Sequence, residues 1–177
     1  RECDRIDDLI VFSENNPFRF NFLDYEMKRT GLGGGHTHNI VKLYMTIHEM
    51  ARKNGGSKGG EDQFWTSALN RLLSRLVELI KLSGEDLTVE NMYNVIASAP
   101  RDKSDFHKES FINSSYCVEC LTLAYEKQSD LPEFRLVDSF WSMEFPSLDE
   151  KTRSIICESA YALMEPFLSG LLKELFT

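Results

Sequence analysis

Hydrophobic residues recur every three or four positions along most of the chain, which is the spacing of one face of an α-helix. The first such stretch follows Thr37, a residue type that favours a helix start. Its apolar positions are Ile40, Leu43, Tyr44, Ile47 and Met50. The Gly-rich segment NGGSKGGED then predicts a flexible connection to the next element.

The strongest periodic signal lies between this connection and Gly84, which is expected to end the helix. Its apolar positions are Phe64, Trp65, Ala68, Leu69, Leu72, Leu73, Leu76, Val77, Ile80 and Leu82. The stripe is wide enough to contact more than one neighbouring helix. Residues 64–82 are therefore predicted to form the central helix of a bundle.

Four shorter periodic segments follow, and prolines separate several of them. They cover residues 88–99, 116–127, 133–145 and 150–163. Thr88 is the expected cap of the first segment. Ser147 and Glu150 have the spacing of a capping box before the last segment, and Pro166 is expected to kink that helix or restart it. Residues 101–115 are polar and without a period.

The N-terminal region has a different pattern. Residues 9–13, LIVFS, form a short apolar run typical of a strand, and turn-forming residues end it. Aromatic and polar residues alternate from Phe18 onward, which favours an extended chain as far as the glycines that begin at Gly31. Together the patterns predict an all-α bundle of five to six helices with a short extended N-terminal arm.

Composition and charge narrow the class of protein. The chain has 177 residues, 42% of them hydrophobic and 27% charged, which is typical of one globular domain. Its formal net charge of −8 argues against a module that neutralises duplex DNA and favours basic protein partners. No apolar run approaches the roughly 20 residues that span a bilayer, so we expect a soluble fragment without direct membrane contact.

The glycine-rich segment GLGGGHTHNIV raises the question of a phosphate-binding loop. A phosphate loop requires Lys after the glycines, and here His36 and Thr37 occupy those positions. The dinucleotide pattern GxGxxG also fails, because position 36 is not glycine. We expect a flexible connection to the helix, and a nucleotide-binding unit in which His36 replaces the lysine remains an alternative.

Other candidate chemical groups favour structural roles. His36 and His38 lie on different sides of a helix start, and His48-Glu49 lacks the second histidine of a zinc-protease motif, so no metal site is expected. Cys117 and Cys120 form a lone CxxC, which we interpret as reduced core thiols. The two other cysteines are Cys3 and Cys157. The tryptophans Trp65 and Trp141 are expected to be buried. No catalytic residue and no cofactor site is predicted.

Acidic residues around the end of the central helix are candidates for contact with a basic partner. They are Glu78, Glu85, Asp86 and Glu90. Asp149 and Glu150 form a similar acidic pair. Acidic residues near a helix start also have a structural explanation, because they interact favourably with the helix dipole.

Two segments of the sequence resemble a known family. They are RIDDLIVFSENNPFRFNFLDYEMKRTGLGG and EDQFWTSALNRLLSRLVELIKLSGEDLTVENMYNVIASAP. The chain resembles the coupling-protein ATPases of type IV secretion and conjugation, the TraG/TraD-type hexameric motors. The most specific parts are RFNFLDYE, the FW that opens the long helix, and YNVIASAP. The resemblance weakens after Lys103 and returns at LMEPFLSGLLKELF.

The resemblance implies a division of the chain and a role for it. Residues 1–31 would be the tail of the first half of a nucleotide-binding motor domain, and residues 32–177 would be its all-α insertion domain. ATP and Mg²⁺ would bind in the parent, a membrane-anchored homo-hexamer, because both nucleotide motifs fall outside this chain. We therefore expect no enzymatic activity from the chain itself.

The family's all-α domains imply cargo recognition at the cytoplasmic face of the bacterial inner membrane. The cargo would be secreted effector proteins or relaxase complexes, with single-stranded DNA as a further partner. Two alternatives remain open at this stage. One is a structural module that packs against neighbouring protomers in the ring, and the other is the nucleotide-binding unit at the glycine loop.

Overall fold

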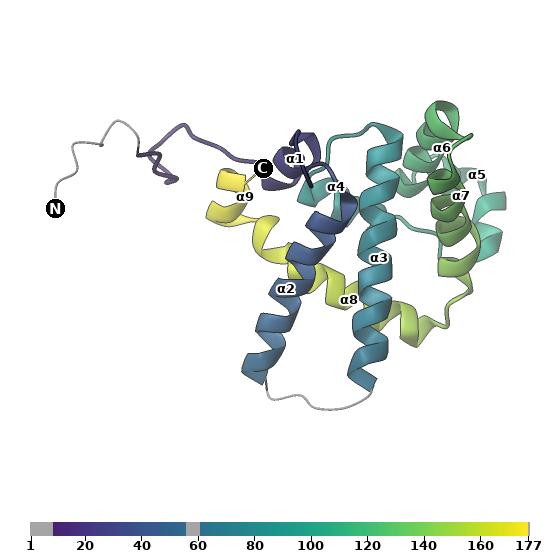
Figure 1. Ribbon diagram of the computed structural model, residues 1–177. Coiled ribbons are helices and arrows are strands. Elements are labelled where there is room, and N and C mark those ends of the chain that lie inside the picture. Colours follow the sequence, from purple (N-terminus) through teal and green to yellow (C-terminus); the bar gives the residue numbers. More distant parts are fainter. Residues whose placement is uncertain (1–8, 56–60, 177) are drawn as a thin grey trace.

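The computed structural model describes residues 9–55 and 61–176, and these two ranges form an all-α fold without a strand. Two long helices, α2 (Thr37–Gly55) and α3 (Glu61–Ser83), lie side by side (Figure 1), and several of the other helices pack against α3. The further helices are α1 (Phe22–Lys28), α4 (Val89–Ala97), α5 (Glu109–Ile112), α6 (Tyr116–Gln128), α7 (Pro132–Ser139), α8 (Glu150–Met164) and α9 (Gly170–Phe176). The all-α prediction is confirmed.

The six helices of eight or more residues correspond to the periodic segments of the sequence, whereas α1, α5 and α9 are short additions. Short 3₁₀-helical or π-helical turns lie between some of these helices. They are η2 (Lys103–His107), η3 (Phe140–Glu144), η4 (Phe145–Ser147) and η5 (Glu165–Phe167). Of these, η3 is a π-helical turn and the other three are 3₁₀ turns.

Helix α3 is the centre of the bundle, as the width of its apolar stripe predicts. It packs against α2, α4, α6, α7 and α8. Its fully buried side chains are Leu69, Leu72, Leu73, Leu76, Val77, Leu79 and Ile80. Gly84, with a φ of 73°, directly follows the helix, and this left-handed backbone is the conformation that a glycine after a helix favours.

Part of the predicted core is instead on the surface. Phe64, at the start of α3, is 58% exposed, and Leu43 and Met50 of α2 are also exposed. Trp65 is half-buried rather than buried, whereas Trp141 is fully buried as predicted. For α3 the reason is geometric, because the helices among the described residues leave its first turns open on part of their circumference (Figure 1). The predicted NGGSKGGED connection lies largely outside the described residues.

Side-chain caps fix the starts of α1, α4, α6 and α8. The hydroxyl of Thr88 accepts a hydrogen bond from the amide of Asn91 (3.0 Å), which confirms the predicted cap of α4. The capping box predicted at Ser147 and Glu150 is wrong. Asp149 caps α8 instead, accepting from the amide of Thr152 (3.1 Å), because the hydroxyl of Ser147 donates to the carbonyl of Met143.

The polar segment 101–115 is organised around the carboxylate of Asp105. One of its oxygens accepts from the amides of Arg101 (2.9 Å) and Asp102 (3.0 Å), and the other accepts from the ammonium of Lys108 (2.7 Å). These hydrogen bonds, led by that of Lys108, lower the pKa of Asp105 to about 2. A segment without hydrophobic periodicity therefore holds its shape through one buried carboxylate.

The N-terminal arm contradicts two predictions. Residues 9–13 form no strand in the structure, and Phe22–Lys28 is a helix rather than extended chain. Asn21 explains the helix, because its side-chain oxygen accepts from the amides of Leu23 and Asp24 at 3.1 Å each. Residues 9–21 leave the bundle as a non-helical arm (Figure 1), as predicted.

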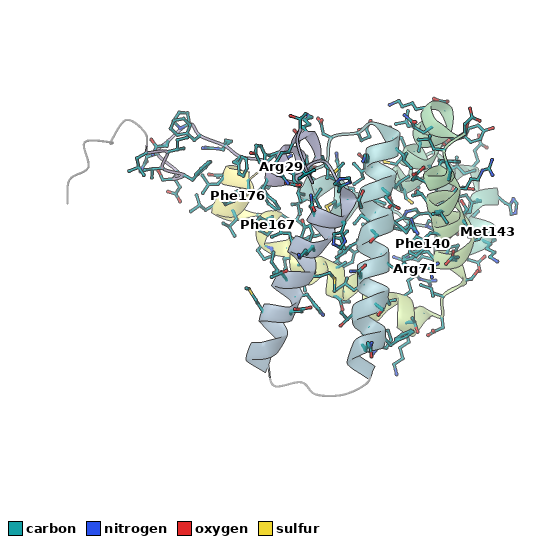
Figure 2. The ribbon with its side chains drawn as sticks, viewed as in Figure 1. Arg29, Arg71, Phe140, Met143, Phe167 and Phe176 are labelled. Carbon is teal, nitrogen blue, oxygen red and sulfur yellow. The ribbon has the colours of Figure 1, made fainter. Side chains whose placement is uncertain are left out.

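An aromatic cluster attaches the arm to the end of the chain. The rings of Phe12 and Phe176 lie 6.2 Å apart, and Phe22 contacts both Phe167 (5.5 Å) and Phe176 (6.2 Å). Figure 2 shows Phe167 and Phe176 together at the side from which the arm departs. The amide of Phe20 donates to the carbonyl of Leu175, at 2.8 Å. Both ends of the bundle therefore lie on one side of the molecule.

No single helix among residues 9–55 and 61–176 has the length and apolar character needed to cross a membrane. The stretch Glu150–Phe167, which comprises α8 and the turn η5, meets that test only as a pair with α9, and the two are bent by 80° relative to each other. Pro166 lies before this break, in the 3₁₀ turn η5 with which the chain continues after α8 ends at Met164.

Candidate functional site

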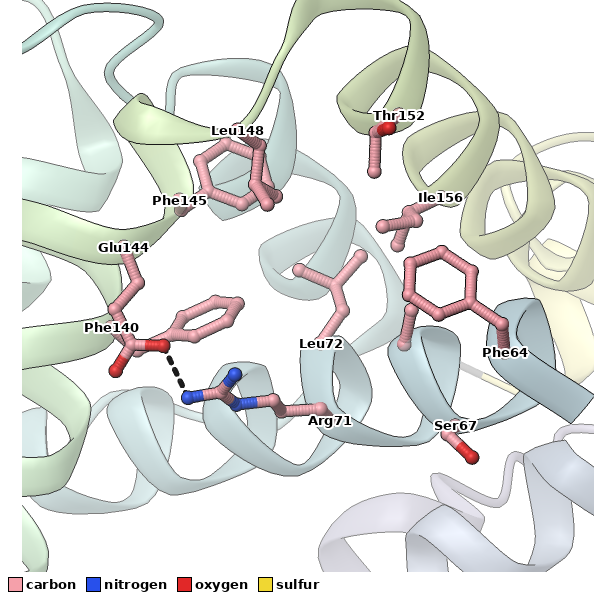
Figure 3. Close-up of a pocket in the computed structure, with 11 residues that line it drawn as sticks. Phe64, Ser67, Arg71, Leu72, Phe140, Glu144, Phe145, Leu148, Thr152 and Ile156 are labelled. Carbon is pink, nitrogen blue, oxygen red and sulfur yellow. Dashed lines mark hydrogen bonds and ion pairs between the residues drawn. The ribbon is translucent and has the colours of Figure 1, made fainter.

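A cavity of about 300 Å³ opens between α3, the turns η3 and η4, and the first half of α8 (Figure 3). Its lining is predominantly apolar. It consists of Phe64, Ser67, Ala68, Arg71, Leu72, Phe140, Glu144, Phe145, Leu148, Thr152 and Ile156. We call this hollow the apolar cavity.

The interior and the rim of the apolar cavity differ. Leu72, Phe145 and Ile156 are buried and form its apolar base. The exposed ring of Phe64 stands at one side, beside Ile156 and Leu72 in Figure 3. A large exposed aromatic ring next to an open apolar space can cover a hydrophobic group that enters it.

An ion pair forms the opposite side of the rim. The guanidinium of Arg71 is paired with the carboxylate of Glu144, and its carbon lies 5.6 Å from the centre of the Phe140 ring. Figure 3 shows the guanidinium next to both the Glu144 carboxylate and the Phe140 ring. Both charged side chains remain partly exposed, 56% for Arg71 and 40% for Glu144. A pair of this kind contributes little to stability, but it holds two charges in place at the mouth of the cavity.

The π-helical turn η3 explains why Phe140, Glu144 and Phe145 point toward α3. The amide of Phe145 donates to the carbonyl of Phe140, a bond that spans five residues. Pro146 follows and has no amide hydrogen with which to continue an α-helix. The indole of the buried Trp141 donates to the carbonyl of Arg75 (3.3 Å), which attaches the turn to α3. The segment from Phe140 to Phe145 therefore forms both the π-helical turn and part of the cavity wall.

The lining of the apolar cavity suits binding rather than bond cleavage. Its polar side chains are the Arg71–Glu144 pair and the hydroxyls of Ser67 and Thr152. A hydroxyl nucleophile needs an adjacent base such as histidine, and the lining contains neither histidine nor cysteine. The arrangement can take up a bulky apolar side chain and present one charge of each sign beside it.

The glycine loop is closed on itself by hydrogen bonds. The amides of Gly34 and Gly35 donate to the carbonyls of Gly31 and Glu26, at 3.1 Å each. The side chain of Asn39 donates to the carbonyl of Gly33 (2.7 Å) and to the carboxylate of Glu26 (2.6 Å). These amides are therefore engaged within the loop.

The carboxylate of Glu26 also sets the charge beside the glycine loop. Arg29 donates to both of its oxygens, at 2.8 and 2.9 Å, and this bond, followed by that of Asn39, lowers the pKa of Glu26. Because Arg29 neutralises this carboxylate, the pair adds no net positive charge that would attract a phosphate group. The nucleotide-binding alternative therefore receives no support from the loop geometry.

The four acidic residues proposed from sequence lie near different elements. Glu78 pairs with Arg75 on α3, and Glu90 pairs with Lys173 of α9 (3.1 Å). Asp86 raises the pKa of Lys28 on α1, after the larger effect of Asp24. Glu85 raises the pKa of the Cys120 thiol on α6, after the larger effect of burial. Their role in partner binding stays a prediction.

The cysteine and metal predictions concern other regions of the fold. Cys117 and Cys120 are buried, Cys157 is half-buried, and all three are free thiols. The core-packing interpretation of the CxxC is therefore confirmed. Within residues 9–55 and 61–176, no group of three or more His, Cys, Asp or Glu side chains could hold a metal ion. Cys3 lies outside the described residues.

Arg71, Phe140 and Glu144 were not among the candidates that the sequence indicated. Arg71 looks like an ordinary polar position within the periodic stripe of α3. The one local signal was the aromatic pair Phe140–Phe145, which is spaced by five residues and followed by proline. Such spacing departs from the α-helical period and indicates a wide turn.

No protein-family model matches this chain, and no curated protein or solved structure matches it either. The resemblance to coupling proteins therefore remains a hypothesis from the sequence. The functional proposal below rests on the geometry of the apolar cavity together with that resemblance.

Proposed function

We propose that this chain is the cargo-recognition domain of a type IV secretion or conjugation coupling protein, at the cytoplasmic face of the bacterial inner membrane. The observation that carries the proposal is the apolar cavity with the Arg71–Glu144 pair at its mouth. In this role the chain binds a basic segment of a secreted protein or relaxase complex. A bulky apolar side chain of the cargo enters the cavity.

Charge favours a basic occupant. The chain has a net charge of −8, which attracts a basic partner at long range. At the mouth of the cavity, Glu144 is partly exposed and is neutralised by a single arginine of the same chain. A lysine or arginine of the cargo can replace Arg71 as the partner of Glu144 at little cost, because an exposed ion pair contributes little to stability.

The contact between the last helix and the N-terminal arm supports an insertion domain. The two connections of a domain inserted within another are expected to lie close together in space. Here the amide of Phe20, in the segment that the resemblance assigns to the motor domain, is bonded to the carbonyl of Leu175, so the last helix returns to that segment. In the proposal, the parent's motor domain, with its ATP and Mg²⁺, lies beyond this side of the bundle.

The test is a calorimetric titration of the chain with a lysine-rich peptide that contains one phenylalanine. We expect a dissociation constant of about 0.1 mM or tighter. Replacing the phenylalanine of the peptide by alanine should remove most of the binding, because the apolar side chain is the proposed anchor. Two results, no saturable binding or equal binding of both peptides, would contradict the proposal.

A cavity-filling variant tests whether the peptide binds in the apolar cavity. Ala68→Phe places a ring in the apolar cavity and should abolish peptide binding, whereas Ala162→Phe, at an exposed alanine of α8, should leave it unchanged. Thermal unfolding of both variants verifies that each is folded. If the peptide binds normally to Ala68→Phe but not to Glu78→Gln or Glu90→Gln, the binding site lies at the acidic residues and not in the apolar cavity.

A further inference from the structure

A second cavity lies on the other side of Phe145, between the end of α4 and one face of α8. Its volume is about 240 Å³. Its lining is Ile96, Ala97, Ala99, Arg101, Phe145, Glu150, Arg153, Ser154, Cys157, Glu158 and Tyr161. Unlike the apolar cavity, it is lined by several charged and polar side chains, and we call it the arginine cavity.

Two guanidinium groups belong to this cavity and come from separate parts of the chain. The backbone of Arg101 is held by the buried carboxylate of Asp105, at 2.9 Å. Arg153 donates from its guanidinium to the carbonyl of Leu148 (3.1 Å), which fixes the direction of its side chain. Both residues line the same cavity, and both guanidiniums lower the pKa of the Cys157 thiol, against the larger opposite effect of burial.

Within the described part of the chain, neither Arg101 nor Arg153 forms an ion pair. Glu150 and Glu158 also line the cavity, yet neither lies within ion-pair distance of the two arginines, since the ion pairs found involve other residues. A guanidinium presents a rigid fork of donors that matches a planar carboxylate. Two such forks at one cavity form a receptor for an anionic group.

The remaining walls are suited to hydrocarbon. Ile96, Ala99 and Phe145 are buried and line the cavity with apolar atoms. Tyr161 completes this wall, and its ring is held by Tyr93, whose ring centre lies 4.9 Å away. A ligand with a small aromatic or aliphatic body fits this surface, and a bare inorganic anion would leave it empty.

We propose that the arginine cavity binds a small monocarboxylate, with its carboxylate on Arg101 and Arg153 and its hydrocarbon body against Phe145 and Tyr161. The charge of the ligand follows from the carboxylates in the lining. Glu150 and Glu158 oppose a dianion such as phosphate more strongly than a single negative charge. This site is separate from cargo binding, because neither arginine lines the apolar cavity.

The test uses benzoate as the probe and benzamide as its neutral counterpart of the same shape. Two-dimensional NMR of the whole chain should show saturable shifts at Ser154, Cys157 and Tyr161, with a dissociation constant of about 1 mM or tighter for benzoate. Benzamide should bind about tenfold more weakly or not at all. Inorganic phosphate should give no saturable shift at these residues.

Variants of the two arginines test whether Arg101 and Arg153 bind the carboxylate of benzoate. Arg153→Gln and Arg101→Gln should each weaken benzoate binding about tenfold, because each removes a charged donor. Arg135→Gln, at an exposed arginine of α7, is the matched control and should bind normally. If Arg153→Gln proves unstable, Arg101→Gln decides alone, since Arg101 is exposed and its side chain forms no ion pair in the described residues.

Three results would overturn the proposal: no saturable shift at the cavity with benzoate, equal binding of benzoate and benzamide, or benzoate binding unaffected by both arginine variants.

A second pair of probes identifies the kind of molecule that carries the carboxylate. Glycyl-phenylalanine and its C-terminal amide distinguish a chain end from a free acid. Binding of the dipeptide acid at least tenfold tighter than benzoate would place the carboxylate on a peptide terminus. The reverse order would indicate a free metabolite acid.

Discussion

The amide of Phe20 and the carbonyl of Leu175 form a hydrogen bond of 2.8 Å that joins residues from opposite ends of the chain. Leu175 is buried, and the rings of Phe12, Phe22 and Phe176 surround this contact. The arm is therefore part of the packed structure at this point, although Phe12 and the three residues before it keep exposed side chains.

Removing a ring from this cluster should loosen both ends together. Phe176→Ala is expected to lower the free energy of unfolding by about 1 to 2 kcal/mol, less than for a fully buried phenylalanine because the ring is half-buried. Amide exchange at Phe20 should become faster in the same variant. Urea unfolding and hydrogen exchange measure the two effects. Leu32→Ala, at a fully exposed leucine, should change neither.

The carboxylate of Asp105 should make stability depend on pH in the acid range. Its pKa is about 2 in the folded chain and about 3.8 in the unfolded chain. Its stabilising contribution is therefore complete above about pH 4 and is lost as the pH falls through 2. Asp105→Asn should cost about 2 kcal/mol at pH 7 and progressively less below pH 4. A cost that stays constant down to pH 2 would disprove this, and Asp130→Asn is the exposed control.

Tyr44 offers a test of a buried hydroxyl without a partner. The side chain is fully buried on α2, and burial raises its pKa. Its hydroxyl has no hydrogen-bond partner among residues 9–55 and 61–176. Tyr44→Phe removes an unsatisfied polar atom and keeps the ring, so the free energy of unfolding should rise by up to about 1 kcal/mol. Thermal and urea unfolding provide the measurement. Tyr125→Phe, at an exposed tyrosine, should have little effect, and a loss above 1 kcal/mol in Tyr44→Phe would indicate a hidden partner.

Two neighbouring glycines in the loop before α2 should respond differently to alanine. A Cβ at Gly34 would lie 2.5 Å from the carbonyl oxygen of Arg29, so the backbone must move. Gly33 has a φ of 77° but open space around it. We expect Gly34→Ala to cost about 2 kcal/mol or more and Gly33→Ala about 1 kcal/mol. Equal effects of the two substitutions on thermal unfolding would show that the loop adjusts without strain.

Helix starts and stops were predictable where one local interaction decides them. Thr88 caps α4 and Gly84 follows α3 because each effect needs only a few neighbouring residues. At the start of α8, Ser147 and Asp149 both have side chains that can cap a helix. Asp149 does so because η4 turns the Ser147 hydroxyl back toward Met143. The geometry of the adjacent turn η4, which the sequence pattern did not indicate, decided between the two candidate caps.

The N-terminal arm shows the opposite case. Residues 9–13 have strand propensity, but a strand exists only when its amides and carbonyls pair with another strand. No strand occurs in residues 9–55 and 61–176, so this part of the chain offers no such partner. Phe22–Lys28 is helical because Asn21 caps it, an interaction that the alternating aromatic residues concealed.

By itself, the sequence determined the all-α class, the central position of α3 and the burial of Cys117, Cys120 and Trp141, because helical periodicity is a local property that reports which face avoids water. Tertiary structure alone decided the two cavities. Arg71 and Glu144 are 73 positions apart, and Arg101 and Arg153 come from different elements. Side chains so distant in the chain meet only after the helices have packed, and that packing depends on the shapes of all the side chains between them.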